Sequence, residues 1–159
     1  MSADIDALAT AVAAQLNDAA RPWHALFTAT VSKTPNYTIQ DLAELKVTVL
    51  PFGETYDTKQ RGIDDVGLIL EIAFQKKADK KPATGADTPL LNIGTELVAL
   101  ERDVLQFLRL KANRKPPTYT AAHLTRSELL PLYDSNVLTH ERRFVGVLRL
   151  TYQEFVETD

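Results

Sequence analysis

Hydrophobic positions at the start of the chain follow a helical spacing. Apolar residues recur every three or four positions from Ile5 to Leu16, which places them on one stripe of a helix. The side chain of Ser2 or Asp4 can accept the unpaired backbone N–H groups at the start of this helix, and Pro22 bars its continuation. The pattern therefore predicts an N-terminal amphipathic helix.

The spacing then changes to alternation, which is typical of strands. Apolar residues alternate with other residues over 25–31 and again over 45–50. Residues 66–74 are apolar on both faces, with Glu71 as their only charge, and this pattern predicts a central strand. If Glu71 were buried it would need a partner or a raised pKa. We favour the alternative, in which it points outward at a sheet edge.

Two later segments have equally clear patterns. Apolar residues over 93–108 form one broad helical face, and charged residues such as Glu101 fall elsewhere on that helix. Residues 144–155 alternate and predict a long C-terminal strand. The tract 118–140 between them is irregular and is interpreted as an anchored loop.

The remaining segments indicate turns and loops. Thr38 to Asp41 has the form of a capping box and predicts a short helical turn. Residues 52–65 are polar, contain Gly53 and Gly62, and are interpreted as a loop. Residues 76–89 are rich in Lys, Asp, Gly, Pro and Thr and predict a second loop.

The order of these elements favours an α+β fold. Strands and helices do not alternate regularly, so a doubly wound parallel sheet is not expected. We expect one domain over 1–159, built from a small, mostly antiparallel or mixed β-sheet with two main helices packed on one face. Two helices cover one side of a sheet, so the remaining apolar surface is covered either by another subunit or by the tract 118–140.

The composition argues against several classes of protein and site. The chain has 159 residues, 45% of them hydrophobic and 25% charged, which fits a globular protein with a real core. It has no cysteine, which excludes disulfides, thiolate nucleophiles and zinc–thiolate sites and suits a reducing compartment. Its net charge of −3 does not favour a free-standing nucleic-acid-binding domain. The N-terminus lacks a secretory pattern, and no apolar run approaches the ~20 residues of a membrane span.

Motifs for catalysis are absent from the sequence. The three histidines form no metal-ligand spacing, and there is no phosphate-binding glycine loop or serine nucleophile elbow. Arg61 lies among Asp57, Asp64 and Asp65, a carboxylate cluster that can hold a cation or do acid–base work. Their spacing matches no calcium loop, so we favour solvated carboxylates. The sequence predicts no catalytic, cofactor or metal site.

The ordered pattern resembles the tail-terminator (tail-completion) proteins of long-tailed bacteriophages. The resemblance covers most of the chain and lies in element order and loose apolar motifs rather than in one diagnostic motif. Its residues are Ile5, Leu8, Val12 and Leu16; Leu45–Pro51; the loop with Arg61; Val66–Lys77, ending Gln75-Lys76-Lys77; Ile93, Leu97, Leu100 and Leu108; Leu132-Tyr133-Asp134; Leu138; and Phe144–Tyr152.

The resemblance implies a structural role in a virion. Proteins of this family form a ring, commonly of six subunits, on the head-proximal end of the tail tube, where they end tube polymerisation and present the head–tail joining surface. The implied partners are copies of this chain, the tail tube protein and a neck protein, with DNA only as passing cargo and no membrane. The implied location is the virion tail, after synthesis in the cytoplasm of the bacterial host. No reaction and no cofactor are implied.

Candidate contact residues follow from the same resemblance. Loops carried on a rigid scaffold often bind partners, so we expect 52–65 and 77–91 to contact the tube or neck. Charged residues in and beside these loops are candidates for ionic contacts with the tube, the neck, a neighbouring subunit or a DNA-carrying lumen. For each of them we favour the alternative, a solvated charge. They are Arg61, Lys76, Lys77, Arg142 and Arg143.

Two other functions remain open at this stage. One is a different phage neck or head-closure protein, which shares the assembly class but binds the capsid portal. The other is a small-molecule-binding α+β domain with a pocket between sheet and helices, since many sites leave no local signature.

Overall fold

The computed structural model describes residues 3–34, 37, 38, 40–78, 88–130, 137 and 141–158, without the side chains of 88–94. Its helices and strands follow the chain in a simple order. They are α1 (Ile5–Leu16), β1 (Ala29–Val31), the 3-10 helix η1 (Asp41–Ala43), β2 (Lys46–Gln60), β3 (Ile63–Lys77), α2 (Thr88–Arg109), the 3-10 helix η2 (Lys111–Asn113), β4 (His123–Leu129) and β5 (Arg143–Glu157).

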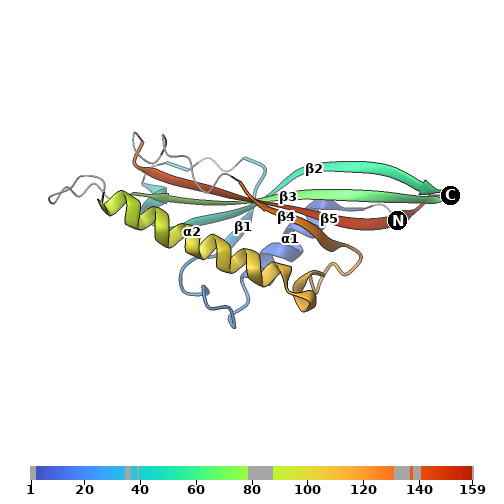
Figure 1. Cartoon of the computed structure of the whole chain (residues 1–159), viewed down its shortest axis with the longest axis horizontal. Helices are drawn as coiled ribbons and strands as arrows, with labels where there is room; N and C mark the ends of the chain where they lie inside the picture. The colour runs from blue at the N-terminus through green and yellow to red at the C-terminus, as the bar shows by residue number, and fades with distance from the viewer. Residues whose placement is uncertain are drawn as a thin grey trace.

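The strands form one mixed sheet of five strands in the order β1-β2-β3-β5-β4. β1 runs parallel to β2, and the other neighbouring pairs are antiparallel. Both long helices lie on the same side of this sheet, with α1 against β1, β2 and β3 and α2 against β4 and β5 (Figure 1). The predicted fold class is confirmed, and the segment predicted as a central strand is β3, in the middle of the sheet.

The core lies between the sheet and the helices. Alternate residues of β3 and β5 point to the helix side and are buried, because successive side chains of a strand point to opposite faces. The helices contribute their apolar stripes, including Leu8 and Leu16 from α1 and Val104 and Leu108 from α2. The strand residues in this core include Val66, Leu68, Leu70, Ile72, Phe74, Phe144, Leu148, Leu150 and Tyr152.

Both predicted caps form, by the hydrogen bonds that the pattern requires. Asp4 is the N-cap of α1, and its Oδ1 accepts from Ala7 N at 3.0 Å. Thr38 N donates to Asp41 Oδ2 at 3.0 Å, and Asp41 N donates to Thr38 Oγ1 at 3.2 Å. This reciprocal pair opens η1 and holds the pKa of the Asp41 carboxyl below its usual value, chiefly through the Thr38 backbone N–H.

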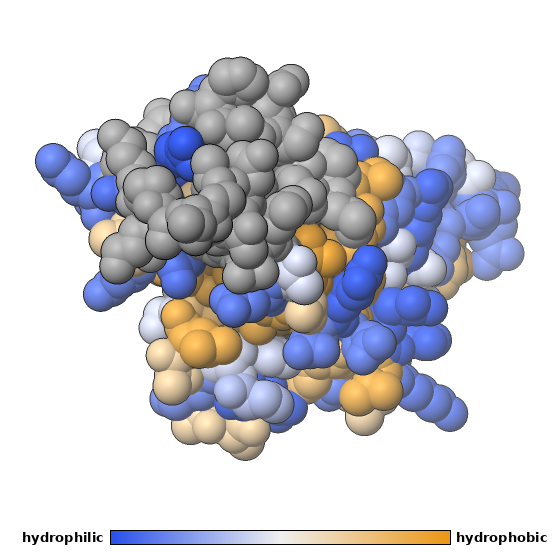
Figure 2. All heavy atoms as spheres, turned by 60° about the vertical axis from the view of Figure 1, so that its left-hand side comes forward, coloured by the Kyte–Doolittle hydropathy of each residue, from blue (hydrophilic) through white to orange (hydrophobic). Residues whose placement is uncertain are grey.

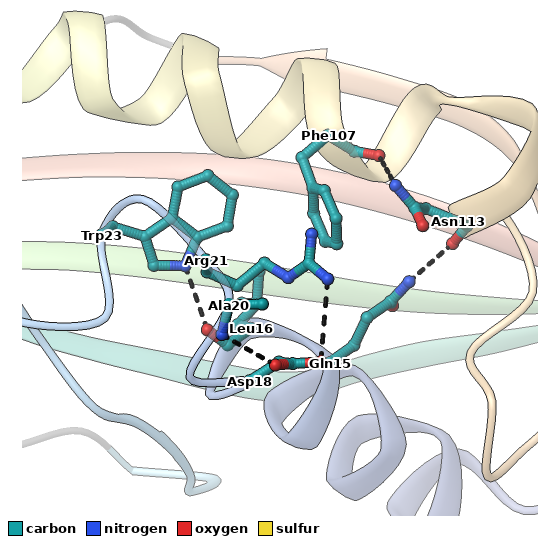
Figure 3. A network of polar contacts seen from close by, with 8 residues as sticks. All are labelled: Gln15, Leu16, Asp18, Ala20, Arg21, Trp23, Phe107 and Asn113. Atoms are coloured by element: carbon teal, nitrogen blue, oxygen red, sulfur yellow. Dashed lines mark hydrogen bonds and ion pairs between the residues drawn. The ribbon is translucent and has the colours of Figure 1, made fainter.

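A network of polar contacts joins the ends of α1 and α2 (Figure 3). Gln15 Nε2 donates to Asn113 O at 2.8 Å, and Asn113 Nδ2 donates to Phe107 O at 2.9 Å. The Arg21 guanidinium lies 4.3 Å from the Phe107 ring centroid and pairs with Asp18 at 3.6 Å. These contacts connect the two helices into one layer behind the sheet.

The prediction of a loop at 52–65 is wrong. β2 and β3 pair from Lys46 opposite Gln75 to Gln60 opposite Ile63, and only Arg61 and Gly62 remain as the turn. The distal half of β2 is exposed, so its sequence lacks the alternation that identifies a half-buried strand. Backbone pairing with β3, rather than burial of side chains, places these residues in the sheet.

Three further expectations need correction. In the segment 25–31 only β1 is a strand, and of the residues before it Ala25 and Leu26 lie in a turn. The tract 118–140 is not wholly irregular, because β4 lies within it and pairs with β5. Residues 131–136 and 138–140 of that tract, like 79–87 of the second predicted loop, lie outside the described residues. Glu71 points away from the helices, but from the central strand rather than from a sheet edge.

Candidate assembly surface

One face of the sheet is turned away from α1 and α2 (Figure 1). It carries both apolar and charged residues. We call this face the open face. Phe52 is 55% exposed on it, and Leu130, at the end of β4, is 49% exposed. Its other residues near the middle of the sheet are half-buried or exposed, and they are Leu50, Ile69, Glu71, Val145, Val147, Arg149 and Thr151.

Charged side chains form a row across the centre of the open face. The register places Glu71 opposite Arg149, and Arg149 opposite Glu128. Arg149 Nη2 pairs with Glu71 Oε2 at 3.5 Å, and its guanidinium lies 4.7 Å from the Phe52 ring centroid. With Arg149 40% exposed, solvent screens this pair, so it contributes only ~0–1 kcal/mol. The row therefore orients side chains more than it stabilises the fold.

One end of the open face is covered by the chain itself. Thr48 and Ala73 are buried there, and the Tyr37 hydroxyl lies 3.0 Å from Thr48 Oγ1 in a hydrogen bond. The nearby η1 contacts β3 and carries Leu42, which is fully buried. β4 provides no cover, because it extends the sheet beside β5. Of the tract 118–140, which the sequence left open as a cover, the strand β4 therefore does not lie over the face.

Four of the five predicted contact residues lie together at one end of the sheet. Lys77 stands opposite Arg143, and Lys76 stands opposite Phe144. Arg142 precedes β5 with a φ of 54°, and its carbonyl accepts from Ala78 N at 2.7 Å. Arg143 also pairs with Glu141 at 2.7 Å. We call Lys76, Lys77, Arg142 and Arg143 the basic end.

Arg61 lies far from the basic end. It occupies the turn between β2 and β3, at the opposite end of β3. A strand rises by ~3.3 Å per residue, so the 15 residues of β3 place Arg61 roughly 46 Å from Lys77. The predicted residues are therefore two separate groups and not one site.

The carboxylate cluster around Arg61 is explained by local partners. Asp65 accepts from Gln153 Nε2 at 2.7 Å and pairs with Lys59 at 3.5 Å, while Asp64 accepts from Thr58 Oγ1 at 3.1 Å. Within the described residues no group of three His, Cys, Asp or Glu side chains is arranged to hold a metal ion. The Asp65 side chain is only 12% exposed, so it is held by these partners rather than solvated.

The basic end adjoins a hollow on the helix side of the sheet. The hollow has a volume of about 890 Å³, and its lining includes His24, Leu26, Lys76, Leu97 and Leu100. Figure 2 shows this end of the molecule, where hydrophobic and hydrophilic side chains are mixed over the described surface. The hollow thus offers both apolar contact and a few charged groups.

The sequence did not predict the burial of one charged residue. Glu101 was expected off the apolar face of its helix, but it is 0% exposed, and its two carboxyl oxygens have no hydrogen-bond partner among the described residues. Burial raises the pKa of the Glu101 carboxyl to about 8. The helical spacing could have predicted this burial, because Glu101 falls on the same stripe as Leu97, Val104 and Leu108.

Comparison with known proteins finds similarity at the level of the fold. No family model matches this chain, and no curated protein matches it. Among solved structures, the chain is similar to the sheath/tube terminator of PVC, an extracellular contractile injection system, in its extended state. The two share 13% sequence identity with a TM-score of 0.49, and the match covers 100% of this chain and 58% of that one. This chain therefore spans less than two thirds of the length of that chain.

In the described part of the chain, no helix is both long enough and apolar enough to cross a bilayer.

Proposed function

We propose that this protein is a tail-terminator subunit. Copies of it form a ring, with six subunits as the expected number, on the head-proximal end of a phage tail tube. The ring covers the surface to which the next tube subunit would add, and it presents the joining surface for a neck protein. DNA passes through as cargo, and the role needs no chemical reaction.

The open face is the observation that carries this proposal. Both long helices lie behind the sheet, while Phe52 and Leu130 remain largely exposed on the other side. Apolar area removed from water contributes ~25 cal/mol per Å², so covering this face with another subunit stabilises an assembly. A head-to-tail contact of this kind closes into a ring when the rotation between subunits fits. The element order quoted for the family resemblance supports the same role.

The test has two measurements on the full chain. Light scattering over a concentration series should show a species of about 106 kDa, six times the 17.7 kDa subunit, with rings in electron micrographs. The chain should also co-sediment with preformed tail tubes and stop their elongation. Tubes that continue to elongate with a saturating amount of this protein would contradict the proposal, whatever its mass in solution.

The same assay separates the terminator from a neck or head-closure protein. A terminator binds tube ends in the absence of capsids, whereas a head-closure protein binds the capsid portal and leaves tube length unchanged.

The hollow beside the basic end favours a second candidate, a small-molecule-binding domain. Its volume of about 890 Å³ is large enough for a ligand, and Lys76 and His24 offer polar groups beside Leu97 and Leu100. A ligand that binds there raises the melting temperature by mass action. A monomer that leaves tubes unaffected but melts higher with a small molecule would favour this candidate over the ring.

A further inference from the structure

A groove lies along the outer edge of β4, away from the basic end and bordering the open face, since Arg126 stands opposite Thr151. Its volume is about 580 Å³. The end of α2 and the segment after it provide Arg109 and Arg114, and β4 provides the rest of the lining, from His123 to Ser127. We call this feature the β4 groove.

The β4 groove is rich in positive charge within a chain of net charge −3. It contains three arginines, Arg109, Arg114 and Arg126, together with His123. Among the described residues their one ion pair joins Arg126 to Glu128. Arg114 uses its Nε to donate to Arg109 O at 2.8 Å, a contact with the backbone that leaves the charge of both guanidinium groups uncompensated. The groove therefore favours an anionic partner.

The same groove has an unpaired strand edge. Among the described residues, β4 is the last strand of the sheet and pairs only with β5. Near the start of β4, Leu124 N donates a backbone hydrogen bond to Arg114 O at 2.9 Å. A register shift at Thr125 follows, and Thr125 Oγ1 donates back to Thr151 O at 3.1 Å. From there to Leu129, no backbone hydrogen bond on the outer side of β4 is found among the described residues, and such an edge is a template for another strand.

We propose that the β4 groove binds an acidic, extended polypeptide segment of a partner protein, which adds to the sheet as a strand beside β4. Main-chain hydrogen bonds at the edge supply part of the affinity, and side-chain contacts supply the specificity. The carboxylates of the segment pair with Arg109, Arg114 and Arg126, because a guanidinium matches a carboxylate in a bidentate geometry. This proposal stands on the groove alone and does not depend on the ring.

A peptide fits this groove better than a nucleic acid does. A strand edge presents N–H and C=O groups at the spacing of another strand, and a phosphodiester backbone has no matching donors. Single-stranded nucleic acid is held in a positive groove with aromatic side chains for base stacking, and the residues lining the β4 groove include no aromatic side chain other than the imidazole of His123.

The experiment uses fluorescence anisotropy with the full chain and a labelled peptide of repeated Glu-Glu-Val-Val, whose glutamates lie on both faces of an added strand. We expect binding, and a loss of about tenfold or more in affinity for Arg126→Glu and for Arg109→Glu, because each removes a charge-assisted hydrogen bond. Arg102→Glu is the matched control, since Arg102 is exposed on α2 but does not line the groove. It should bind as the wild type does.

Two further probes separate the proposal from its alternatives. A peptide with the same side chains but N-methylated on alternate residues keeps its charge and loses the main-chain donors, so it should bind at least tenfold more weakly. Equal affinity for this peptide, or tighter binding of an oligothymidylate, would overturn strand addition in favour of a general anion site. If a variant fails to fold, hydrogen exchange on the wild type tests strand addition instead. The Glu–Val peptide should slow amide exchange within 125–129. Unchanged exchange there would refute the proposal.

Discussion

Glu101 and Gly146 form a close contact in the core, where a helix side chain meets a strand backbone. A Cβ at Gly146 would overlap Glu101 Oε1 and lie 2.7 Å from its Cδ. Glycine at this position therefore leaves the space that the carboxyl occupies. The carboxyl is protonated at neutral pH because its pKa is about 8, which avoids an uncompensated buried charge.

Glu101 should make the stability of the protein depend on pH. The folded pKa of about 8 exceeds the usual 4.5, so its contribution is fully present below pH 4.5 and is lost as the pH rises toward 8. One pH unit corresponds to about 1.4 kcal/mol in this window, or on the order of 3 kcal/mol by pH 7. Urea unfolding from pH 5 to 8 should show a smaller fall in the free energy of unfolding for Glu101→Gln. Glu96→Gln, at an exposed site of the same helix, is the control. If the free energy of unfolding of Glu101→Gln fell with pH as steeply as that of the wild type, this assignment would be contradicted.

The contact between the two residues predicts non-additive mutations. Gly146→Ala should destabilise by roughly 1–3 kcal/mol, since the added methyl overlaps a side chain that is fully buried. In a Glu101→Ala background the carboxyl is gone, and the cost of Gly146→Ala should fall. A double-mutant cycle measured by urea unfolding gives the coupling free energy. Additive effects would show that the carboxyl is not what excludes a side chain at this position.

At the scale of elements, the long β2–β3 hairpin is the feature in which the structure differs most from the sequence-based prediction. Its turn depends on Gly62, which has a φ of 82° and whose carbonyl accepts from Thr158 N at 2.8 Å. A left-handed backbone favours glycine, because a Cβ is strained there. The turn thus connects the hairpin to the end of β5.

The hairpin provides a paired glycine test. Gly62→Ala should lower the free energy of unfolding by about 1 kcal/mol, because alanine must adopt the positive φ. Gly53→Ala, in the same hairpin, should be nearly neutral, since a Cβ there has no heavy atom within 4 Å. Thermal unfolding of both variants measures the difference. Equal effects would indicate that the turn tolerates a side chain and can relax.

At the scale of the whole molecule, the sheet separates two kinds of surface. One face holds the core under α1 and α2, and the open face holds Phe52 above the Glu71–Arg149 pair. The basic end and the turn with Arg61 lie at opposite ends of β3. A subunit with distinct faces and ends can make different contacts on each, which a ring between a tube and a neck requires.

The proposed use of the open face predicts a separation of assembly from folding. Phe52→Ser should reduce ring formation and tube binding while changing the melting temperature little, because Phe52 is 55% exposed in the subunit. Leu110→Ser is the matched control, with a side chain 58% exposed at the end of α2. Light scattering and tube co-sedimentation report assembly. If both variants assemble like the wild type, the ring does not use the open face around Phe52.

The sequence by itself determined the elements whose side chains are sorted by burial. The stripe of α1, the apolar run of β3, the stripe of α2 and the alternation of β5 are local patterns, and each predicted its element. The caps at Asp4 and Thr38 were equally local, since they depend on residues within one turn. The general fold class followed from the order of these elements.

Only the tertiary structure decided the features that depend on pairing between distant segments. The distal half of β2 and the whole of β4 lack a burial pattern, and their strands exist because β3 and β5 supply hydrogen-bond partners. Glu101 is buried because α2 lies over Gly146, 45 positions along the chain. The β4 groove likewise needs residues of α2 and β4 to meet. Periodicity records which side of one element is buried, whereas partner strands and close contacts are set by the packing of the whole chain.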